Sequence, residues 1–143
     1  MSGFHVQSFA FIGRGRRVFP VKGFVKIDKE PILSRQVEEP DFCLVMDPTL
    51  IDAKKYKDGS VVIFNSSEKL VFPQLKRRKI RSYFVDATEL ALTHLKSNTP
   101  NTAMLGALAK LFNKVSMKSI KSSMEDLPKE NFAVFDEGYK TVR

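Results

Sequence analysis

The 143-residue chain has no tryptophan, two histidines and a single cysteine, Cys43. One cysteine can form neither an intrachain disulfide nor a cysteine-ligated metal or iron–sulfur site by itself. Because Cys43 sits inside the apolar run Phe-Cys-Leu-Val-Met, we expect a packed core thiol. His5 falls on an expected strand and His94 on an expected helix, and we interpret both as structural residues. The sequence also lacks a P-loop, a zinc-ligand spacing and a nucleophile elbow, so no metal site and no catalytic residue is predicted.

Long apolar runs are missing as well. No run approaches the ~18 residues that a membrane-spanning helix needs, and the first residues lack the pattern of a secretory signal. We therefore expect a soluble, cytoplasmic protein without a membrane partner. The composition, 43% hydrophobic and 28% charged, is typical of a globular protein, and we predict one domain over residues 1–143.

Negative charge is scarce relative to positive charge. The chain has 24 Lys and Arg residues against 16 Asp and Glu, a net charge of +8 and a pI near 9.7. Two basic clusters carry much of this charge: Arg14, Arg16 and Arg17, and Lys76, Arg77, Arg78 and Lys79 with Arg81. Such charge fits an anionic partner, but nucleic-acid binding usually adds a groove helix or exposed stacking aromatics. Neither is apparent, so we do not expect nucleic acid as the physiological ligand.

Strand patterns open the chain. Residues 21–27 alternate with period two, with Val21, Val25 and Ile27 on one face, which predicts a half-buried strand. The turn residues Asp-Lys-Glu-Pro at 28–31 then predict a hairpin in which this strand folds back onto residues 32–33.

Short, continuous apolar runs follow at residues 42–46 and 61–64, and a further strand is expected at 80–85. Runs of this kind are typical of parallel strands that are covered on both faces, and ligands of such sheets tend to bind beyond the carboxyl ends of the strands. We expect a short helix within residues 49–56. Asp47 could carry a proton or a metal together with Asp41, but a cap of the segment after Pro48 is the reading we prefer.

Helix signals dominate the second half. Asp86 is an N-cap candidate with Glu89 in the capping-box position, which predicts a helix over 87–95. The Thr-Pro pair at 99–100 predicts the start of a second helix.

Gly106 lies inside that second helix, where glycine costs roughly 1 kcal/mol relative to alanine. We therefore expect another backbone to approach it closely. Ser116 is expected to cap a third helix, and a final helix should start near Pro128.

Four blocks of sequence resemble a known family. Arg16-Arg17, Pro20-Val21 and Lys26-Ile27-Asp28 follow one another in the order of its signature. The other blocks are residues 5–9, 39–50 and 101–107. With these blocks the chain resembles, over roughly residues 4–142, the gamma subunit or gamma-type domain of the pyruvate and ketoisovalerate ferredoxin oxidoreductases, which are 2-oxoacid:acceptor oxidoreductases.

The resemblance implies an α/β fold, a Rossmann-like three-layer sandwich with a mostly parallel sheet and an added hairpin. Family members normally begin with a strand and a Gly-x-Gly-Gly-Gln-Gly turn, which nothing before Phe4 supplies. Gly13-Arg14-Gly15 is no substitute because a strand pattern follows it. We therefore expect an N-terminally truncated chain whose first strand and glycine-rich turn are missing. Either Met1 is an internal start, or the chain is a cut or divergent version that obtains its first strand elsewhere, and in each case a strand edge is left for a partner.

The resemblance also implies a function. The chain would be the gamma subunit of a 2-oxoacid:ferredoxin oxidoreductase, with pyruvate favoured, and would support coenzyme A-dependent decarboxylation to acyl-coenzyme A. Thiamine diphosphate, magnesium and iron–sulfur clusters would be held by alpha, beta and delta-type partner subunits, which pass electrons to ferredoxin.

Arg14, Arg16 and Arg17 are the candidate site of this chain. Guanidinium groups bind phosphates through forked donors, so these residues could contact coenzyme A or a partner subunit. A solvated basic loop without a specific role remains open. Two other readings of the whole chain also remain: a stand-alone basic module that binds nucleic acid or another polyanion, and a truncated paralogue that no longer assembles.

Overall fold

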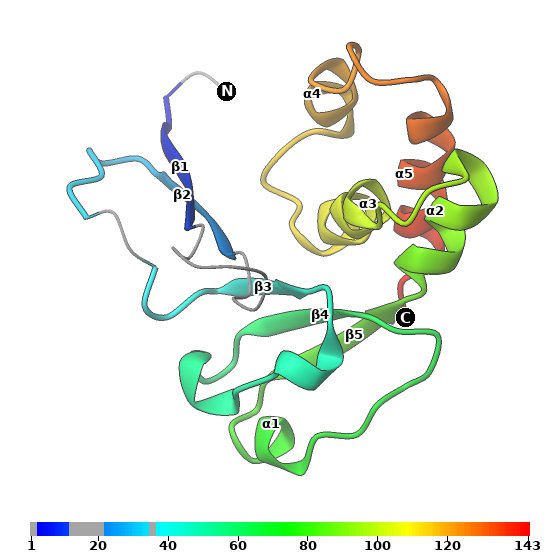
Figure 1. Cartoon of the computed structure of the whole chain (residues 1–143). Coiled ribbons are helices and arrows are strands. Elements are labelled where there is room, and N and C mark those ends of the chain that lie inside the picture. Colours follow the sequence, from blue (N-terminus) through cyan, green and yellow to red (C-terminus); the bar gives the residue numbers. More distant parts are fainter. Residues whose placement is uncertain (1–2, 12–21, 35–36) are drawn as a thin grey trace. The chain divides into compact units, whose positions relative to one another are not determined.

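The computed structural model describes residues 3–11, 22–34 and 37–143 (Figure 1). It divides into two compact units, Met1–Glu39 and Pro40–Arg143. The single gamma-type domain expected over residues 1–143 stays a prediction.

The first unit contains an antiparallel hairpin of β1 (His5–Phe11) and β2 (Lys22–Asp28). Its register runs from His5 opposite Asp28 to Phe11 opposite Lys22, and the rings of Phe9 and Phe24 stack across the strands at 5.2 Å between centroids. The strand predicted at 21–27 is thereby confirmed from Lys22 onward, and Val21 lies outside the described residues.

The predicted pairing of β2 with residues 32–33 is wrong, because β2 pairs with the strand before it. The turn chemistry at 28–31 is real, since the Asp28 carboxylate accepts a hydrogen bond from the Glu30 amide at 3.2 Å. This turn ends the strand without starting another one. Leu33 is 94% exposed, so it gains no burial from a strand pairing.

The second unit is built on a parallel sheet in the order β3 (Phe42–Val45), β4 (Val61–Asn65) and β5 (Arg81–Val85). These are the three strands that the apolar runs predict. The outer edge of β5 is closed by Arg143, whose backbone exchanges two hydrogen bonds with Phe84, at 2.8 and 3.0 Å.

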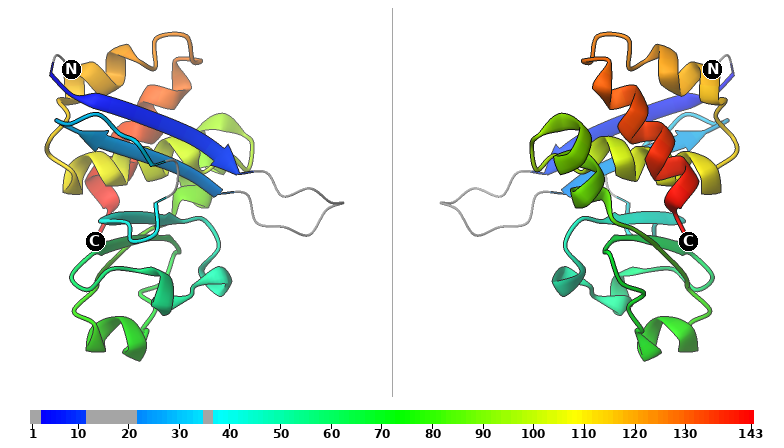
Figure 2. Two further views of the ribbon diagram at one scale, coloured as in Figure 1. Left: turned by 90° about the vertical axis from the view of Figure 1, so that its left-hand side faces the viewer. Right: turned by 90° about the vertical axis from the view of Figure 1, so that its right-hand side faces the viewer.

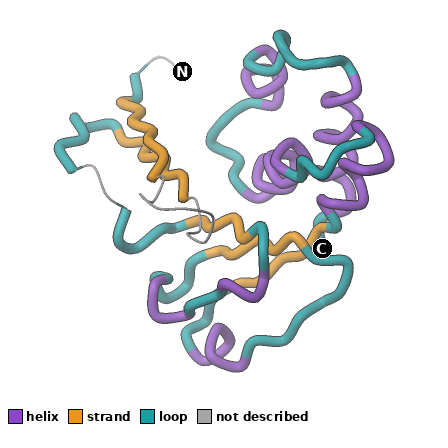
Figure 3. Tube along the Cα trace, viewed as in Figure 1, coloured by secondary structure: helices purple, strands orange, loops and turns teal. Residues whose placement is uncertain are grey.

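Helices cover one face of this sheet. They are α2 (Ala87–Leu95), α3 (Asn101–Leu111) and α5 (Glu130–Thr141), and α4 (Met117–Ser122) lies between α3 and α5 in the chain (Figures 1 and 3). The core between this layer and the sheet contains Val61, Ile63, Met104 and Val134.

A thinner layer covers the opposite face. It consists of α1 (Pro73–Arg77) and two 3-10 turns, η1 (Pro48–Leu50) and η2 (Ala53–Lys55) (Figure 2). Leu75 of α1 is 1% exposed and packs with Phe64 and Phe84, and Cys43 is half-buried against the same cluster. The three layers, with the hairpin added, confirm the α/β fold class.

The two 3-10 turns replace the single helix expected within residues 49–56. Each turn begins at an aspartate whose carboxylate accepts a backbone N–H, Asp47 from Thr49 at 2.9 Å and Asp52 from Lys54 at 3.2 Å. The second cap, Asp52, interrupts the segment and begins a new turn, because its carboxylate competes with helical hydrogen bonds for the same amides. The preferred role of Asp47 as a cap is confirmed.

Most helix starts agree with the sequence. The Asp86 carboxylate accepts the Glu89 amide at 3.1 Å, and the Ser116 hydroxyl accepts the Ser119 amide at 3.1 Å. α3 follows Pro100 without a side-chain cap.

Gly106 meets another backbone, as predicted. A Cβ atom at Gly106 would lie 2.1 Å from the Phe135 carbonyl oxygen, and one at Gly138 would lie 2.1 Å from the Ala103 carbonyl oxygen. α3 and α5 therefore cross in direct backbone contact. Within the described residues, no helix combines the length and the apolar character that crossing a membrane requires.

Candidate functional site

The predicted site residues Arg14, Arg16 and Arg17 lie outside the described residues, so their role stays a prediction. What the structure describes is the pair of strands that flank them. β1 ends at Phe11 and β2 begins at Lys22, and these two residues are paired in the hairpin register. Residues 12–21 thus connect two neighbouring strand ends.

The two faces of the hairpin differ in chemistry. Gln7, Phe9 and Phe24 are half-buried on one face. The other face carries Val6 and Val25, which are 55% and 62% exposed, and small or apolar residues complete it without any charged side chain. An exposed, uncharged strand face of this kind suits contact with another protein.

The carboxyl ends of the parallel strands form a structural junction. The Asn65 amide group at the end of β4 donates to the Met46 carbonyl at 3.2 Å and to the Thr88 hydroxyl at 2.8 Å. Its oxygen accepts the Thr88 amide at 3.1 Å. Asn65 therefore ties the end of β3 to the start of α2. The amide group of Asn65 is thus engaged in hydrogen bonds within the chain.

Asp47 and Asp41 do not form a shared site. The Asp47 carboxylate accepts hydrogen bonds from both the hydroxyl and the amide of Thr49, which together lower the pKa of Asp47. Asp41 instead forms an ion pair with Lys57 at 3.0 Å. In the part of the chain that the structure describes, no three His, Cys, Asp or Glu side chains gather as a metal site would require.

The histidines lie in separate elements. His5 is exposed in the first position of β1, opposite Asp28, and His94 is half-buried in the last turn of α2. Their structural interpretation stays a prediction.

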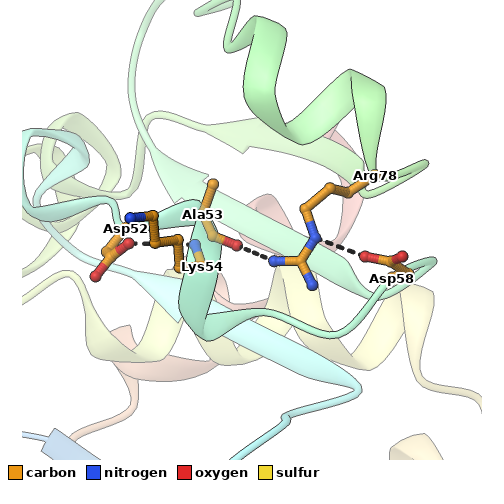
Figure 4. A network of polar contacts seen from close by, with 5 residues as sticks. All are labelled: Asp52, Ala53, Lys54, Asp58 and Arg78. Carbon is orange, nitrogen blue, oxygen red and sulfur yellow. Dashed lines mark hydrogen bonds and ion pairs between the residues drawn. The ribbon is translucent and has the colours of Figure 1, made fainter.

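The second basic cluster is divided by the fold. Arg78 is a structural clamp: its Nε donates to the Asp58 carboxylate at 2.6 Å, and its Nη1 donates to the Ala53 carbonyl (Figure 4). These bonds join the end of α1 to η2. The remaining cations of the cluster point to solvent as exposed side chains: Lys76, Arg77, Lys79 and Arg81.

Sequence reasoning missed both the clamp and Tyr56. Tyr56 is 8% exposed, and burial, assisted by the neighbouring Cys43 side chain, raises the pKa of its hydroxyl above the ordinary value. Tyr56 stands among lysines without an apolar period, so no local pattern predicts its burial. The partners of Arg78 lie 20 and 25 residues away, beyond the reach of any local pattern.

The chain is similar to known proteins over almost its whole length. A family model described as pyruvate ferredoxin/flavodoxin oxidoreductase matches residues 1–141. The common subunit gamma of the pyruvate/ketoisovalerate oxidoreductases of Pyrococcus furiosus is 40% identical over 133 residues, which cover 88% of this chain and 72% of that protein.

Solved structures agree. Pyruvate oxidoreductase subunit PORC from Thermotoga maritima superposes with a TM-score of 0.80 at 28% identity, covering 99% of this chain and 82% of that chain. A chain of the 2-oxoglutarate:ferredoxin oxidoreductase from Magnetococcus marinus, solved with 2-oxoglutarate, coenzyme A and succinyl-CoA, reaches 0.66 at 20% identity. It covers 96% of this chain and 26% of that one and shows a shared fold alone. On the family match and the 40% identity, the chain belongs to the pyruvate ferredoxin/flavodoxin oxidoreductase family, as one of its gamma-type members.

Proposed function

We propose that this chain is the gamma subunit of a 2-oxoacid:ferredoxin oxidoreductase whose first candidate substrate is pyruvate. The observation that carries the proposal is the 40% identity to the common subunit gamma of Pyrococcus furiosus, which covers 88% of the chain. A second relative, pyruvate synthase subunit PorC of Methanocaldococcus jannaschii, is 37% identical over 126 residues. Both relatives are named for pyruvate, which favours it over other 2-oxoacids.

The chemistry is assigned to partner subunits. Thiamine diphosphate would stabilise the acyl carbanion, and iron–sulfur clusters would carry single electrons to ferredoxin. The one cysteine of this chain is too few for a four-cysteine cluster. Alpha, beta and delta-type subunits would therefore hold thiamine diphosphate, magnesium and the clusters, and release acyl-coenzyme A.

The role of this chain is to bind and position. Its hairpin offers an uncharged face with Val6 and Val25 exposed, which would be buried against a partner subunit. Arg14, Arg16 and Arg17, in the connection between the two strands, would contact either that partner or the phosphates of coenzyme A.

Purification of the tagged chain from its native cells tests the assembly. We expect larger subunits, a brown iron–sulfur chromophore and pyruvate oxidation that depends on coenzyme A. A colourless chain recovered alone, or with nucleic acid, would contradict the proposal and favour a non-assembling paralogue or a polyanion-binding module.

The double variant Arg16→Ala/Arg17→Ala tests the contacts proposed for the arginines. We expect either weaker assembly or a higher KM for coenzyme A, by about tenfold, because a charge-assisted hydrogen bond contributes roughly 1.5–3 kcal/mol. Lys114→Ala/Lys118→Ala is the matched control, because it removes two exposed cations from the second unit. Unchanged assembly and an unchanged KM in the arginine variant would reject both contacts.

A further inference from the structure

Positive charge gathers on one side of the second unit. Residues 50–81 contain nine Lys or Arg and three Asp or Glu, so they contribute +6 of the net charge of +8. This segment includes η2, α1 and their connecting turns, which cover the sheet face opposite α2, α3 and α5 (Figure 1). Residues 82–143 contain eight cations against seven anions and are nearly balanced. The thin layer of the fold is therefore its electropositive side.

Part of this charge is neutralised within the chain. Three ion pairs hold cations of this side: Lys55 with Asp52 at 3.3 Å, Lys57 with Asp41 at 3.0 Å and Arg78 with Asp58 at 2.6 Å. Six exposed cations remain, of which Lys54 and Lys69 stand apart in the sequence. The other four are close together in the sequence, and we call them the basic patch: Lys76, Arg77, Lys79 and Arg81. Across the described ranges of the chain, no carboxylate lies within 4.0 Å of their charged nitrogens.

Lys79 occupies a position that favours glycine. Its φ is 55°, and it follows α1 at a left-handed C-terminal turn in which the Ile80 amide donates to the Leu75 carbonyl at 3.0 Å. A lysine in this conformation is less stable than a glycine would be. The chain thus keeps a cation in the patch at a conformational cost.

The surroundings of the patch fit a protein better than a nucleic acid. The ring of Phe72 is half-buried and stacks on Phe64 at 4.9 Å, so it offers no platform for a base. α1 has five residues, too few for a groove-reading helix. Val71, which precedes α1, is 79% exposed. Val71 is close in the sequence to the exposed cations of the patch, and an apolar centre with a polar rim is typical of a protein interface.

We propose that the basic patch, together with Val71, docks onto an acidic surface of a partner protein. This proposal rests on the proposed function, because we expect the partner to belong to the oxidoreductase complex or to the proteins that work with it. Complementary charge would accelerate the encounter and fix its orientation, and added salt would weaken it.

Zero-length carbodiimide cross-linking tests this chemistry, because the reagent joins a lysine amine to a carboxylate only where the two are in contact. The tagged chain, purified with its partners from native cells, is treated at about 50 mM and at about 500 mM salt, where the Debye length shortens several-fold. We expect Lys76 or Lys79 to be joined to Asp or Glu of another protein at low salt, and this product to fall at high salt.

The charge-reversal variant Lys76→Glu/Lys79→Glu should lower the recovery of that partner at least about tenfold at low salt, as reversed charges repel an acidic surface. Lys114→Glu/Lys118→Glu makes the same change in net charge elsewhere and should retain the partner. Lys79→Gly serves as a second variant that preserves the turn after α1, and it should lower recovery by a smaller factor. Circular dichroism confirms that each variant is folded.

The outcomes separate this proposal from the proposed function. If the complex assembles and oxidises pyruvate but the patch lysines join no other protein, the docking surface is rejected and the function stands. If cross-links form without coenzyme A-dependent oxidation, the function fails and the docking surface stands. If nuclease-sensitive material is bound by the wild type and lost from the charge-reversal variant, the proposal of an acidic protein partner is rejected. The proposal is also rejected if the chain is recovered alone.

Discussion

The two faces of the parallel sheet are buried by different means. On one face, α3 and α5 approach until their backbones touch at Gly106 and Gly138. On the other, a five-residue helix and two 3-10 turns are held by side chains, with Arg78 as the clamp between them. We call the face covered by α2, α3 and α5 the helical face and the one covered by α1, η1 and η2 the loop face. The helical face is close to electrical neutrality, whereas the loop face carries most of the net charge. Rigid backbone contact and solvent-facing charge are thus separated by one sheet.

This separation predicts where substitutions are costly. At Gly106 and Gly138 the helical face has no room for an extra atom, because the contacts there are with backbone atoms, which cannot turn aside as a side chain can. The loop face depends on hydrogen bonds and aromatic packing, such as the stack of Phe64 on Phe84 at 5.4 Å between centroids. Substitutions on the loop face should therefore lower the free energy of unfolding by less, and they should also change the exposed surface.

The largest effect is expected from Gly106→Ala. Its Cβ would lie 2.1 Å from the Phe135 carbonyl oxygen, so α3 and α5 must separate. We expect a loss of about 3 kcal/mol or more in the free energy of unfolding. Urea unfolding followed by circular dichroism measures it, since the chain has no tryptophan for fluorescence. Gly23→Ala in β2 meets no atom within 4 Å and is the control. Equal midpoints for the two variants would disprove the backbone contact.

On the loop face, Arg78→Ala should lower the free energy of unfolding by about 1 kcal/mol, because it removes two hydrogen bonds from a partly exposed side chain. Arg78→Lys should recover only part of this loss, since an ammonium cannot donate along the fixed fork of a guanidinium. A double-mutant cycle with Asp58→Ala isolates the ion pair. Full recovery by lysine would show that charge alone holds the two segments together.

Alkaline pH should weaken the loop face through Tyr56. Burial raises the pKa of Tyr56 in the folded chain above its ordinary value of 10.0, so this stabilisation is complete below pH 10.0 and is lost as the pH rises further. The unfolded chain then ionises first, at a cost to folding of up to about 1.4 kcal/mol per pH unit. The difference between the wild type and Tyr56→Phe, measured from about pH 9 to pH 11 by urea unfolding, should show this slope. A constant difference would contradict it.

The smallest effect should be a gain in stability. Lys79 and Lys96 both have a φ of 55°, one at the end of α1 and one at the end of α2. Replacement of Lys79 by Gly should stabilise the fold by about 0.5–1 kcal/mol, because glycine adopts this conformation without strain. Lys96→Gly should gain less, since the Lys96 amine donates to the Thr93 carbonyl at 2.9 Å. Thermal melts of the two variants compare the faces directly.

Local patterns were sufficient for much of the fold. The strands β3, β4 and β5 follow from short apolar runs, and α2 follows from the Asp86 cap. Gly106 even predicted the close backbone contact, because glycine in a helix interior has a cost that a neighbouring backbone explains. These elements depend on neighbours within a few residues.

Non-local pairing was beyond the same reasoning. The turn at 28–31 suggested a partner after β2, whereas the partner lies before it, across a ten-residue connection from Phe11 to Lys22. The run at 76–79 gave no sign that Arg78 is a clamp and its neighbours are exposed, because Asp58 and Ala53 come from a distant turn. For Arg14, Arg16 and Arg17, the role of the candidate site stays a prediction.

The contact between α3 and α5 has an evolutionary consequence. The atom that excludes a side chain at Gly106 is a carbonyl oxygen of Phe135, and the one at Gly138 is a carbonyl oxygen of Ala103. Neither obstacle is a side chain, so a smaller side chain at a neighbouring position cannot make room. Among relatives, we therefore expect each of the two glycines to be invariant independently of the other. The remaining residues of the helical layer should vary more freely.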